Sequence, residues 1–90
     1  MAIGEDNIAK GKNSFVMGYN NTAHGENSFI IGKYAKTATD DNLAFAVGNG
    51  NGIGSRSNAF AIDWDGNAFV KAKLFATNID ITESLTANDI

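Results

Sequence analysis

A phenylalanine-centred motif recurs along this chain of 90 residues. It reads Asn-Ser-Phe-Val-Met-Gly at residues 13–18 and Asn-Ser-Phe-Ile-Ile-Gly at 27–32, and looser copies occupy 42–48 and 58–63. The spacings between the central phenylalanines are 14, 16 and 15 residues, at Phe15, Phe29, Phe45 and Phe60. Self-similarity at so short a period is typical of a protein built from stacked repeats. Because one coil of such a stack has no pocket of its own, the repeat favours scaffolding or adhesion over catalysis.

Each repeat has two unequal halves. Residues 14–18 and 28–32 are rich in aromatic and β-branched side chains and predict a strong strand. The segments at 7–11 and 21–25 carry smaller side chains and predict a weaker strand. Fourteen residues at about 3.3 Å each trace a closed path of roughly 46 Å. That length suits one flat coil of two short strands and two tight turns, and the twelve asparagines and ten glycines tolerate positive φ in such turns.

We therefore predict an all-β fold, a β-roll of 14–16-residue coils that stack in parallel over all four copies of the motif. An up-and-down meander is the rival geometry, but its successive strands would be alike, whereas these alternate between strong and weak. The strong strands are continuously apolar, which is expected where both faces of a strand are buried. One face would pack inside the coil against Ala9, Ala23 and Ala35.

The other face of the strong strands needs a cover from outside the coil. Over four coils it would form an apolar stripe too large to remain exposed on a soluble monomer. The simplest cover is the same face of identical chains, so we predict a closed symmetric oligomer. Which alternate set of side chains faces the axis stays open. The residues assigned to the structural core and the oligomer contact are Phe15, Val16, Met17, Phe29, Ile30, Ile31, Phe45, Val47, Phe60 and Ile62.

The composition limits the partners of this stack. No cysteine is present, so neither disulfides nor a thiolate metal site can stabilise the fold, and oligomerisation remains the available means. The net charge of −3 and seven scattered basic residues argue against nucleic acid as a partner. No apolar stretch approaches the length that crosses a bilayer, so we expect no membrane insertion by this chain. Because Met1 falls inside a repeat, we expect the chain to be part of a longer protein.

These motifs resemble the Asn-Ser-Val-Ala-Ile-Gly repeat of the YadA-like head of trimeric autotransporter adhesins. The intervening Ala-x-Gly-x-Asn-Ser pattern at residues 9–14 and 23–28 belongs to the same family. The resemblance covers roughly residues 2–63 and implies a left-handed parallel β-roll, assembled as a tight homotrimer with the strong strands innermost. The chain departs from the family in its phenylalanines, which replace the usual valine, and in insertions at 39–41 and 48–52. No coiled-coil stalk follows.

Residues 60–71 instead resemble the Asp-Trp-Asp-Gly-Asn hairpin common in tail-fibre and baseplate proteins of phages and prophages. We therefore divide the chain into β-roll repeats at residues 1–63 and a C-terminal hairpin and capping segment at 64–90. Within that segment 78–82 is a candidate short strand. Another expected strand buries one face, formed by Val70, Ala72, Leu74 and Ala76.

The two resemblances together imply a non-enzymatic, trimeric structural and adhesive module of a phage or prophage tail fibre. The alternative is a head fragment of a bacterial trimeric autotransporter adhesin that binds a host surface or matrix. The expected partners are further copies of the chain and a glycan or protein of a bacterial or host surface. The expected location is a virion tail fibre or an extracellular cell surface, and no cofactor is expected.

Acidic residues near the end of the fourth motif invite two chemical readings. Asp63, Asp65 and Asn67 match the first positions of an EF-hand loop, but Ala68 and Leu74 stand where glycine and glutamate are required. A carboxylate pair for glycoside hydrolysis needs a sugar-sized cleft, which residues beside a tight turn do not form; the pair at 40–41 meets the same objection. We favour a two-residue hairpin turn at Asp65 and Gly66, with positive φ at both.

The remaining candidates also favour structural roles. Residues 48–54 are rich in glycine but fit no register of Gly-x-Gly-x-x-Gly, so we expect an enlarged coil turn. This loop and residues 37–41 are the places where we expect receptor contact. His24 is the only histidine, which excludes an intrachain zinc triad, and we expect it to be exposed. Three aromatic residues lie at strand ends: Tyr19, Tyr34 and Trp64. We favour a role in capping the strands; the alternative is stacking on sugar rings.

Overall fold

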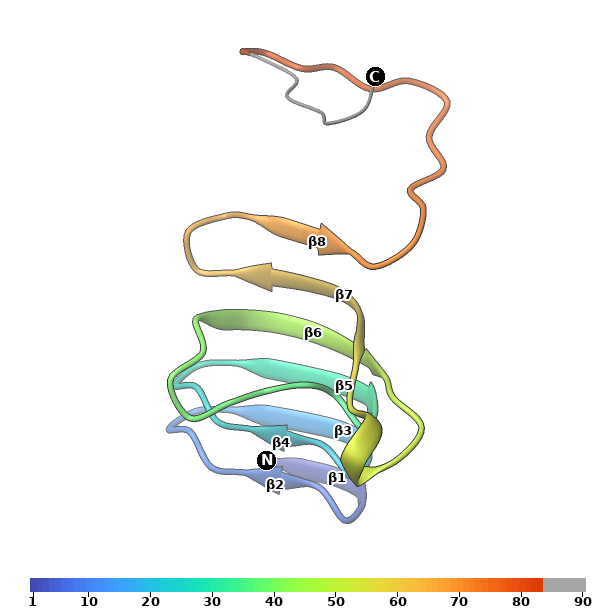
Figure 1. Cartoon of the computed structure of the whole chain (residues 1–90). Helices are drawn as coiled ribbons and strands as arrows, with labels where there is room; N and C mark the ends of the chain where they lie inside the picture. Colours follow the sequence, from blue (N-terminus) through green and yellow to red (C-terminus); the bar gives the residue numbers. More distant parts are fainter. Residues whose placement is uncertain (84–90) are drawn as a thin grey trace.

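The strong strands stack in parallel, as the repeat predicts. The computed structural model describes residues 1–83, and Figure 1 shows the strands piled in one column. Each motif pairs with the equivalent positions of the next, so that Phe15 lies opposite Phe29 and Phe29 opposite Phe45. The expected all-β fold of parallel coils is thereby confirmed. The parallel part of the sheet contains β1 (Ala2–Glu5), β3 (Phe15–Tyr19), β5 (Phe29–Lys33) and β6 (Leu43–Asn49).

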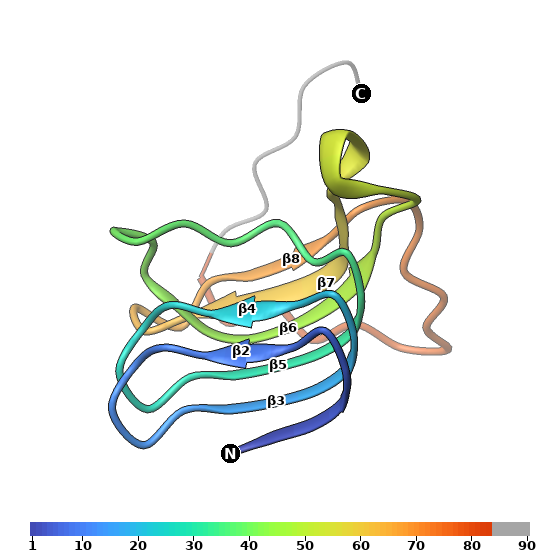
Figure 2. The same cartoon turned by 90° about the horizontal axis from the view of Figure 1, so that it is seen from below.

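The weaker halves of the coils form a second layer across from this sheet. β2 (Ile8–Ala9) and β4 (Thr22–Ala23) pair in parallel and make a separate two-stranded sheet. Figure 2 looks at the stack from below and shows these short strands across the coil from β3 and β5. In the third coil the equivalent segment, residues 34–42, contains no strand. The second layer therefore weakens towards the end of the roll.

Each half of a coil ends at a residue in the left-handed backbone region. Among residues 1–83, five non-glycine residues have positive φ, and they are spaced seven residues apart: Asp6, Asn13, Asn20, Asn27 and Tyr34. Asparagine and aspartate adopt this region more readily than other non-glycine residues, because their short polar side chains bond to nearby backbone groups. Two seven-residue halves make one coil, which is the physical origin of the 14-residue repeat.

The interior of the roll is narrow and takes one side chain from each strong strand. Val16 and Ile30 are 0% and 1% exposed, and Ala46 occupies the equivalent position of the next strand. Ala23 and Ala35 are buried in the same cluster from the opposite side of the coil. The small residues of the weak halves thus let the two layers approach each other, as the sequence predicts.

A ladder of asparagine side chains ties each coil to the next. Asn21 is fully buried; its Nδ2 donates to the carbonyl of Gly32 at 2.8 Å, and its Oδ1 accepts from the backbone N–H of Ala35 at 2.9 Å. Fourteen residues earlier, Asn7 makes the same two contacts with Gly18 and Asn21, at 2.8 and 3.1 Å. Ala35 occupies the next position of this ladder. Its side chain is a methyl group without an amide, so the ladder ends there.

The fourth motif does not form a fourth parallel coil. β7 (Asn58–Asp63) pairs with β6 in the antiparallel direction, so the prediction of four parallel coils is wrong at this point. Residues 48–54 were expected as an enlarged coil turn; instead, residues 50–57 form a hairpin loop that contains the short 3-10 helix η1 (Ile53–Ser55). The N–H of Asn49 donates to the carbonyl of Ser57 at 2.9 Å and closes the loop. Because the chain turns back here instead of crossing to the second layer, β7 runs back along β6.

β8 (Ala68–Val70) pairs antiparallel with β7 and is the last strand of the sheet. In the connecting turn Gly66 has a φ of 89°, whereas Asp65 is not in the positive-φ region. The expected two-residue turn with positive φ at both positions is therefore wrong. The N–H of Asp63 donates to the carbonyl of Asn67 at 3.0 Å, which closes a three-residue loop with glycine in the left-handed position. The division of the chain at residue 63 stays a proposal.

Beyond β8 the chain is extended and open to solvent. Every residue from 71 to 83 is exposed, and Leu74 is 69% exposed. The expected strand with a buried face at Val70, Ala72, Leu74 and Ala76 is thus absent from the single chain, because nothing packs against it. The expected strand at 78–82 is absent as well. The last part of the predicted capping segment, residues 84–90, lies outside the described residues.

Candidate functional site

The face of the sheet that points away from the roll interior is apolar along its whole length. Successive side chains of a strand point to opposite faces. Because Val16 and Ile30 point into the coil, the residues on either side of them point outward. The same alternation holds around Ala46 and Ala61. We call the resulting set of eight side chains the outer apolar face: Phe15, Met17, Phe29, Ile31, Phe45, Val47, Phe60 and Ile62.

The phenylalanines of the outer apolar face stack edge to face. The distances between ring centroids are 4.8, 5.6 and 6.2 Å along the series Phe15, Phe29, Phe45 and Phe60. Aromatic pairs of this kind contribute about 0.5–1.5 kcal/mol beyond their burial. Because β7 runs antiparallel to β6, Phe60 lies opposite Val47, and Ile62 lies opposite Phe45. Both rows of the face therefore stay apolar although the fourth motif is reversed.

In the single chain this face is partly open to solvent. Phe29 and Met17 are 40% and 41% exposed, and the other six side chains are half-buried. A contiguous apolar surface on a soluble protein marks a site of interaction. Of the ten residues predicted for the core and the oligomer contact, Val16 and Ile30 fill the roll interior and the other eight make up the outer apolar face.

Sequence reasoning missed several residues that the interior depends on. Ala46 and Ala61 are 0% and 5% exposed, and Asn21 is 0% exposed. The alanines are too small to stand out in a hydrophobic pattern, and their burial follows from their pairing with Ile30 and with each other. The asparagine is buried because both ends of its amide have partners. A signal was present in its case, since asparagine recurs at the same position 14 residues earlier.

An arginine closes the corner of the third coil. The guanidinium of Arg56 donates to the carbonyl and the side-chain oxygen of Asn20, at 2.8 and 2.7 Å, and to the carbonyl of Ala35 at 3.4 Å. It also lies over the ring of Tyr34, 5.7 Å from the centroid. The Tyr34 ring packs edge-on against Tyr19 at 5.4 Å, and the Tyr34 phenol raises the pKa of the Tyr19 hydroxyl above its usual value. Sugar stacking by these tyrosines stays a prediction.

The aspartate-rich turn after β7 satisfies its own polar groups. Oδ1 of Asp63 accepts from the N–H groups of Asp65 and Asn67, at 3.0 and 2.9 Å, and its Oδ2 accepts from the Asn67 amide at 3.1 Å. The hydrogen bonds from Asn67, and then those from the turn backbone, lower the pKa of Asp63. Asp65 accepts from the Asn42 amide at 3.0 Å, and the neighbouring Trp64 is 56% exposed. The arrangement stabilises the turn and provides no cleft between two carboxylates.

Two other observations concern metals and membranes. Within residues 1–83, no group of three or more histidine or acidic side chains is placed to hold a metal ion. None of the helical segments in that range is long and apolar enough to cross a membrane.

The loops expected to contact a receptor are partly held by the roll. In the glycine-rich loop at 48–54, the N–H of Gly50 donates to the carbonyl of Lys33 at 3.1 Å. In the loop at 37–41, the hydroxyl of Thr37 donates to the carbonyl of Thr22 at 2.7 Å. His24, which we expected to be exposed, is half-buried. These loops project from the corners and the weak side of the roll, away from the outer apolar face.

Comparison with known proteins bears on the first coils. The YadA head domain repeat matches the chain in two copies, at residues 1–21 and 9–35. No curated protein and no solved structure matches the chain. The matched residues are the ones that form the parallel coils from β1 to β5. The resemblance inferred from the motifs is thereby confirmed for this part of the chain.

Proposed function

We propose, from the premise that residues 1–35 consist of YadA head repeats, that this chain is a non-enzymatic, trimeric structural and adhesive module of a phage or prophage tail fibre. The repeat by itself marks an adhesin-like head module. The trimer and the fibre are our own extension of that finding. The observation that carries the trimer is the outer apolar face, which no part of the described chain covers.

Identical chains are the simplest cover for this face. The interior of each roll is already filled by its own side chains, so the outer apolar face can be buried only by something outside the roll. Three copies around an axis would bury this face against one another and remove it from water. Each Å² of apolar surface buried in this way stabilises the assembly by about 25 cal/mol. Because the coils stack along the axis, the product is a stiff rod with the weak halves and the loops pointing outward.

Such a rod would act mechanically. Its outward loops, at 37–41 and 48–54, would present side chains three times around the axis to a glycan or protein of a bacterial or host surface. Three linked contacts turn weak individual affinities into a much stronger overall attachment. No reaction is needed for this role, and the engagement of Asp63 and Asp65 in their own turn supports a non-enzymatic module. Incubation with capsule or cell-wall polysaccharide should accordingly release no reducing sugar.

The absolute mass in solution tests the trimer directly. One chain has a mass of 9.5 kDa. Light scattering on a sizing column should give three times that mass. A stable species of a single chain mass would overturn the proposal, because the outer apolar face would then have to be tolerated in water.

A bacterial adhesin head is the second candidate, and the YadA head repeat is the observation that favours it. The fibre reading draws its support from the Asp-Trp-Asp-Gly-Asn turn between β7 and β8. The full sequence of the parent protein separates the two. A fibre would continue into further hairpins or a receptor-binding tip, whereas an adhesin would continue into a coiled coil and a membrane anchor.

A further inference from the structure

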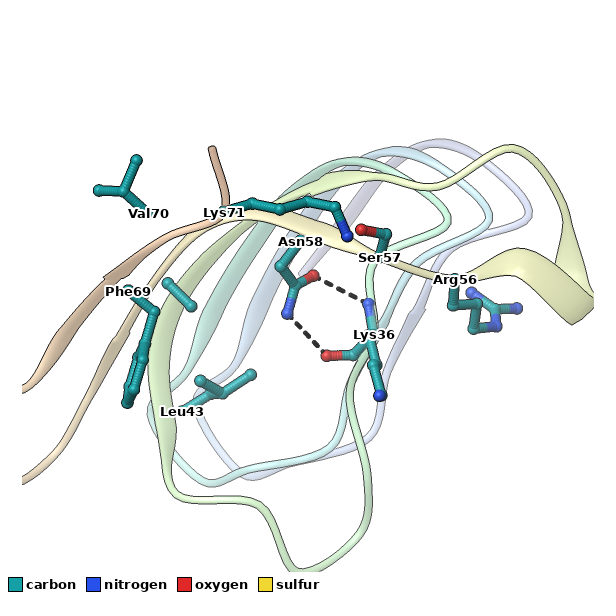
Figure 3. Close-up of a pocket in the computed structure, with 9 residues that line it drawn as sticks. Lys36, Leu43, Arg56, Ser57, Asn58, Phe69, Val70 and Lys71 are labelled. Carbon is teal, nitrogen blue, oxygen red and sulfur yellow. Dashed lines mark hydrogen bonds between the residues drawn. The ribbon is translucent and has the colours of Figure 1, made fainter. Parts of the chain in front are cut away.

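A basic groove lies at the end of the roll, where the hairpin continues the sheet but the second layer has stopped. Its volume is about 680 Å³, and Figure 3 shows the nine residues that line it. Leu43 and Phe69 point into the groove and form an apolar wall. Three cationic residues, Lys36, Arg56 and Lys71, also line the groove, and no acidic residue does. The chain as a whole, in contrast, has a net charge of −3.

The groove opens on the side of the sheet opposite the outer apolar face. Phe69 pairs with Ala61, and Ala61 pairs with Ala46, which points into the roll. The row formed by these three residues is therefore the continuation of the roll interior beyond the third coil. A trimer that buries the outer apolar face would leave this groove uncovered.

The segment after β8 has the opposite character. It carries four large apolar side chains that are 45–87% exposed, and two acidic residues, Asp80 and Glu83, follow in its second half. No lysine or arginine follows Lys73. Figure 1 shows this segment leaving the end of β8 and running away from its own roll. The exposed apolar side chains are Leu74, Phe75, Ile79 and Ile81.

We propose that the groove of one copy receives residues 78–83 of a neighbouring copy. This inference rests on the proposed trimer, which brings the copies together. β8 is the outermost strand of the sheet, so its free edge offers backbone groups to which an extended segment can pair. As a strand, residues 78–83 present Ile79 and Ile81 on one face, towards the apolar wall. Glu83 lies on the same face as the isoleucines and comes close to the cationic rim of the groove, whereas Asp80 points to the opposite face.

The docked segment resolves two uncovered features at once. The apolar wall of the groove and the isoleucines of the segment would leave water together. Lys36 and Lys71 would gain in Glu83 an acidic partner that the lining of the groove lacks. The alternating sequence of residues 78–82, which predicts a strand that the single chain does not form, would then form that strand between copies.

Engineered cysteines test this contact, because the chain has no cysteine of its own. The double variant Lys36→Cys with Ile81→Cys places one thiol in the groove and one in the segment. Lys36 is suited to this change because it is exposed and contacts Asn58 through its backbone N–H and carbonyl, which the substitution keeps. Mild oxidation should give disulfide-linked multimers on a non-reducing gel. The matched control, Lys10→Cys with Ile81→Cys, puts the first thiol in an early coil and should give no such multimers.

Charge reversal distinguishes a specific contact from chance collision. Adding Lys71→Glu to the Lys36→Cys, Ile81→Cys variant should slow cross-linking by about two- to fivefold, the effect of one exposed ion pair. Adding Glu83→Lys to that variant should restore the rate. Equal rates with and without Lys71→Glu would overturn the proposed charge recognition.

The remaining outcomes separate this inference from the proposed function. Disulfides formed only within one chain would show that the segment covers its own groove, and the proposal would be wrong. A trimeric mass without cross-links beyond the control would overturn the docking but leave the trimer intact. A monomeric mass would remove both.

Discussion

The parallel coils and the last strand of the terminal hairpin bury their inward-facing side chains to different extents. In β3 and β5 the residue after the phenylalanine, Val16 or Ile30, is covered by the second layer and at most 1% exposed. In β8 the inward-facing Phe69 is 55% exposed, because the second layer has ended before it. Both regions satisfy their backbone by strand pairing. The comparison shows that pairing organises the sheet, whereas burial depends on a layer across from it.

The two regions also differ in how their turns are held. The coils are tied to one another by the side-chain amides of the half-buried Asn7 and the buried Asn21, which reach from each coil to the next. In the turn of the hairpin, Asp63 accepts from the N–H groups of residues 65–67, and Asn42, which precedes β6, bonds to Trp64 and Asp65. Loss of a contact should therefore spread along the coils, whereas in the hairpin it should stay within the turn and residue 42.

The largest effect is expected on the outer apolar face. Phe29→Asp places a carboxylate at the centre of an apolar contact, where the effective desolvation penalty is several kcal/mol and no cation is available as partner. We expect light scattering to give the mass of a single chain. Lys33→Asp, at the exposed end of the same strand, is the control and should keep the assembled mass. A Phe29→Asp variant that stays folded and trimeric would falsify the packing proposed for this face.

A core truncation compares the coils with the hairpin loop. Ile30→Ala removes a side chain that is 1% exposed and should lower the free energy of unfolding by about 2–5 kcal/mol. Ile53→Ala makes the same chemical change in η1, where the side chain is 73% exposed, and should cost less than about 0.5 kcal/mol. Urea unfolding measures both. Comparable losses would mean that the roll interior is not the main source of stability.

The first asparagine of the ladder, Asn7, should contribute less to stability than the second, Asn21. Asn21→Ala leaves the carbonyl of Gly32 and the N–H of Ala35 without this partner, at a cost of about 1–3 kcal/mol for a buried unsatisfied group. Asn7→Ala removes the same contacts in a less buried position and should cost less. Thermal unfolding of the two variants side by side gives the comparison. The reverse order would contradict the ladder as described.

The smallest effect is expected for the dependence of the hairpin turn on pH. The folded-state pKa of Asp63 lies below its ordinary value of 3.8, because the carboxylate accepts hydrogen bonds from Asn67 and the turn backbone. Its contribution to stability is therefore present above pH 3.8 and is lost as the pH falls through the lower folded-state pKa. Amide NMR signals of Gly66 and Asn67 should shift with a midpoint below pH 3.8, and Asp63→Asn should abolish that titration. A midpoint above 3.8 would exclude these bonds as the cause.

The direction of β7, the strand of the fourth motif, shows where sequence reasoning reaches its limit. Residues 45–47 read Phe-Ala-Val and residues 60–62 read Phe-Ala-Ile, so the pattern of large, small and large apolar side chains is the same in either direction. Periodicity therefore could not separate a parallel coil from a hairpin. The hydrogen bond between Asn49 and Ser57, which closes the loop before β7, decides the matter. This contact joins two backbone groups, so the residue types at 49 and 57 do not reveal it.

The assignment of faces was open for a similar reason. Phe15, Val16 and Met17 are all apolar, so hydrophobicity does not tell which of them enters the coil. The structure places Val16 inside because the space between the layers is set by the alanines of the weak halves. Phenylalanine is too large for that space and lies on the outer apolar face, where its rings stack on those of the neighbouring coils.

The sequence by itself determined the parallel coils and their 14-residue period, because every coil repeats the same local choices of turn residue, small residue and strand. Only the tertiary structure decided where the stack ends, which face is left open and what remains uncovered after β8. Those features depend on contacts between residues far apart in the chain, such as Arg56 with Asn20, and on whether a second layer is present. A repeated pattern records what each coil has in common, and the end of a stack is where that common environment is lost.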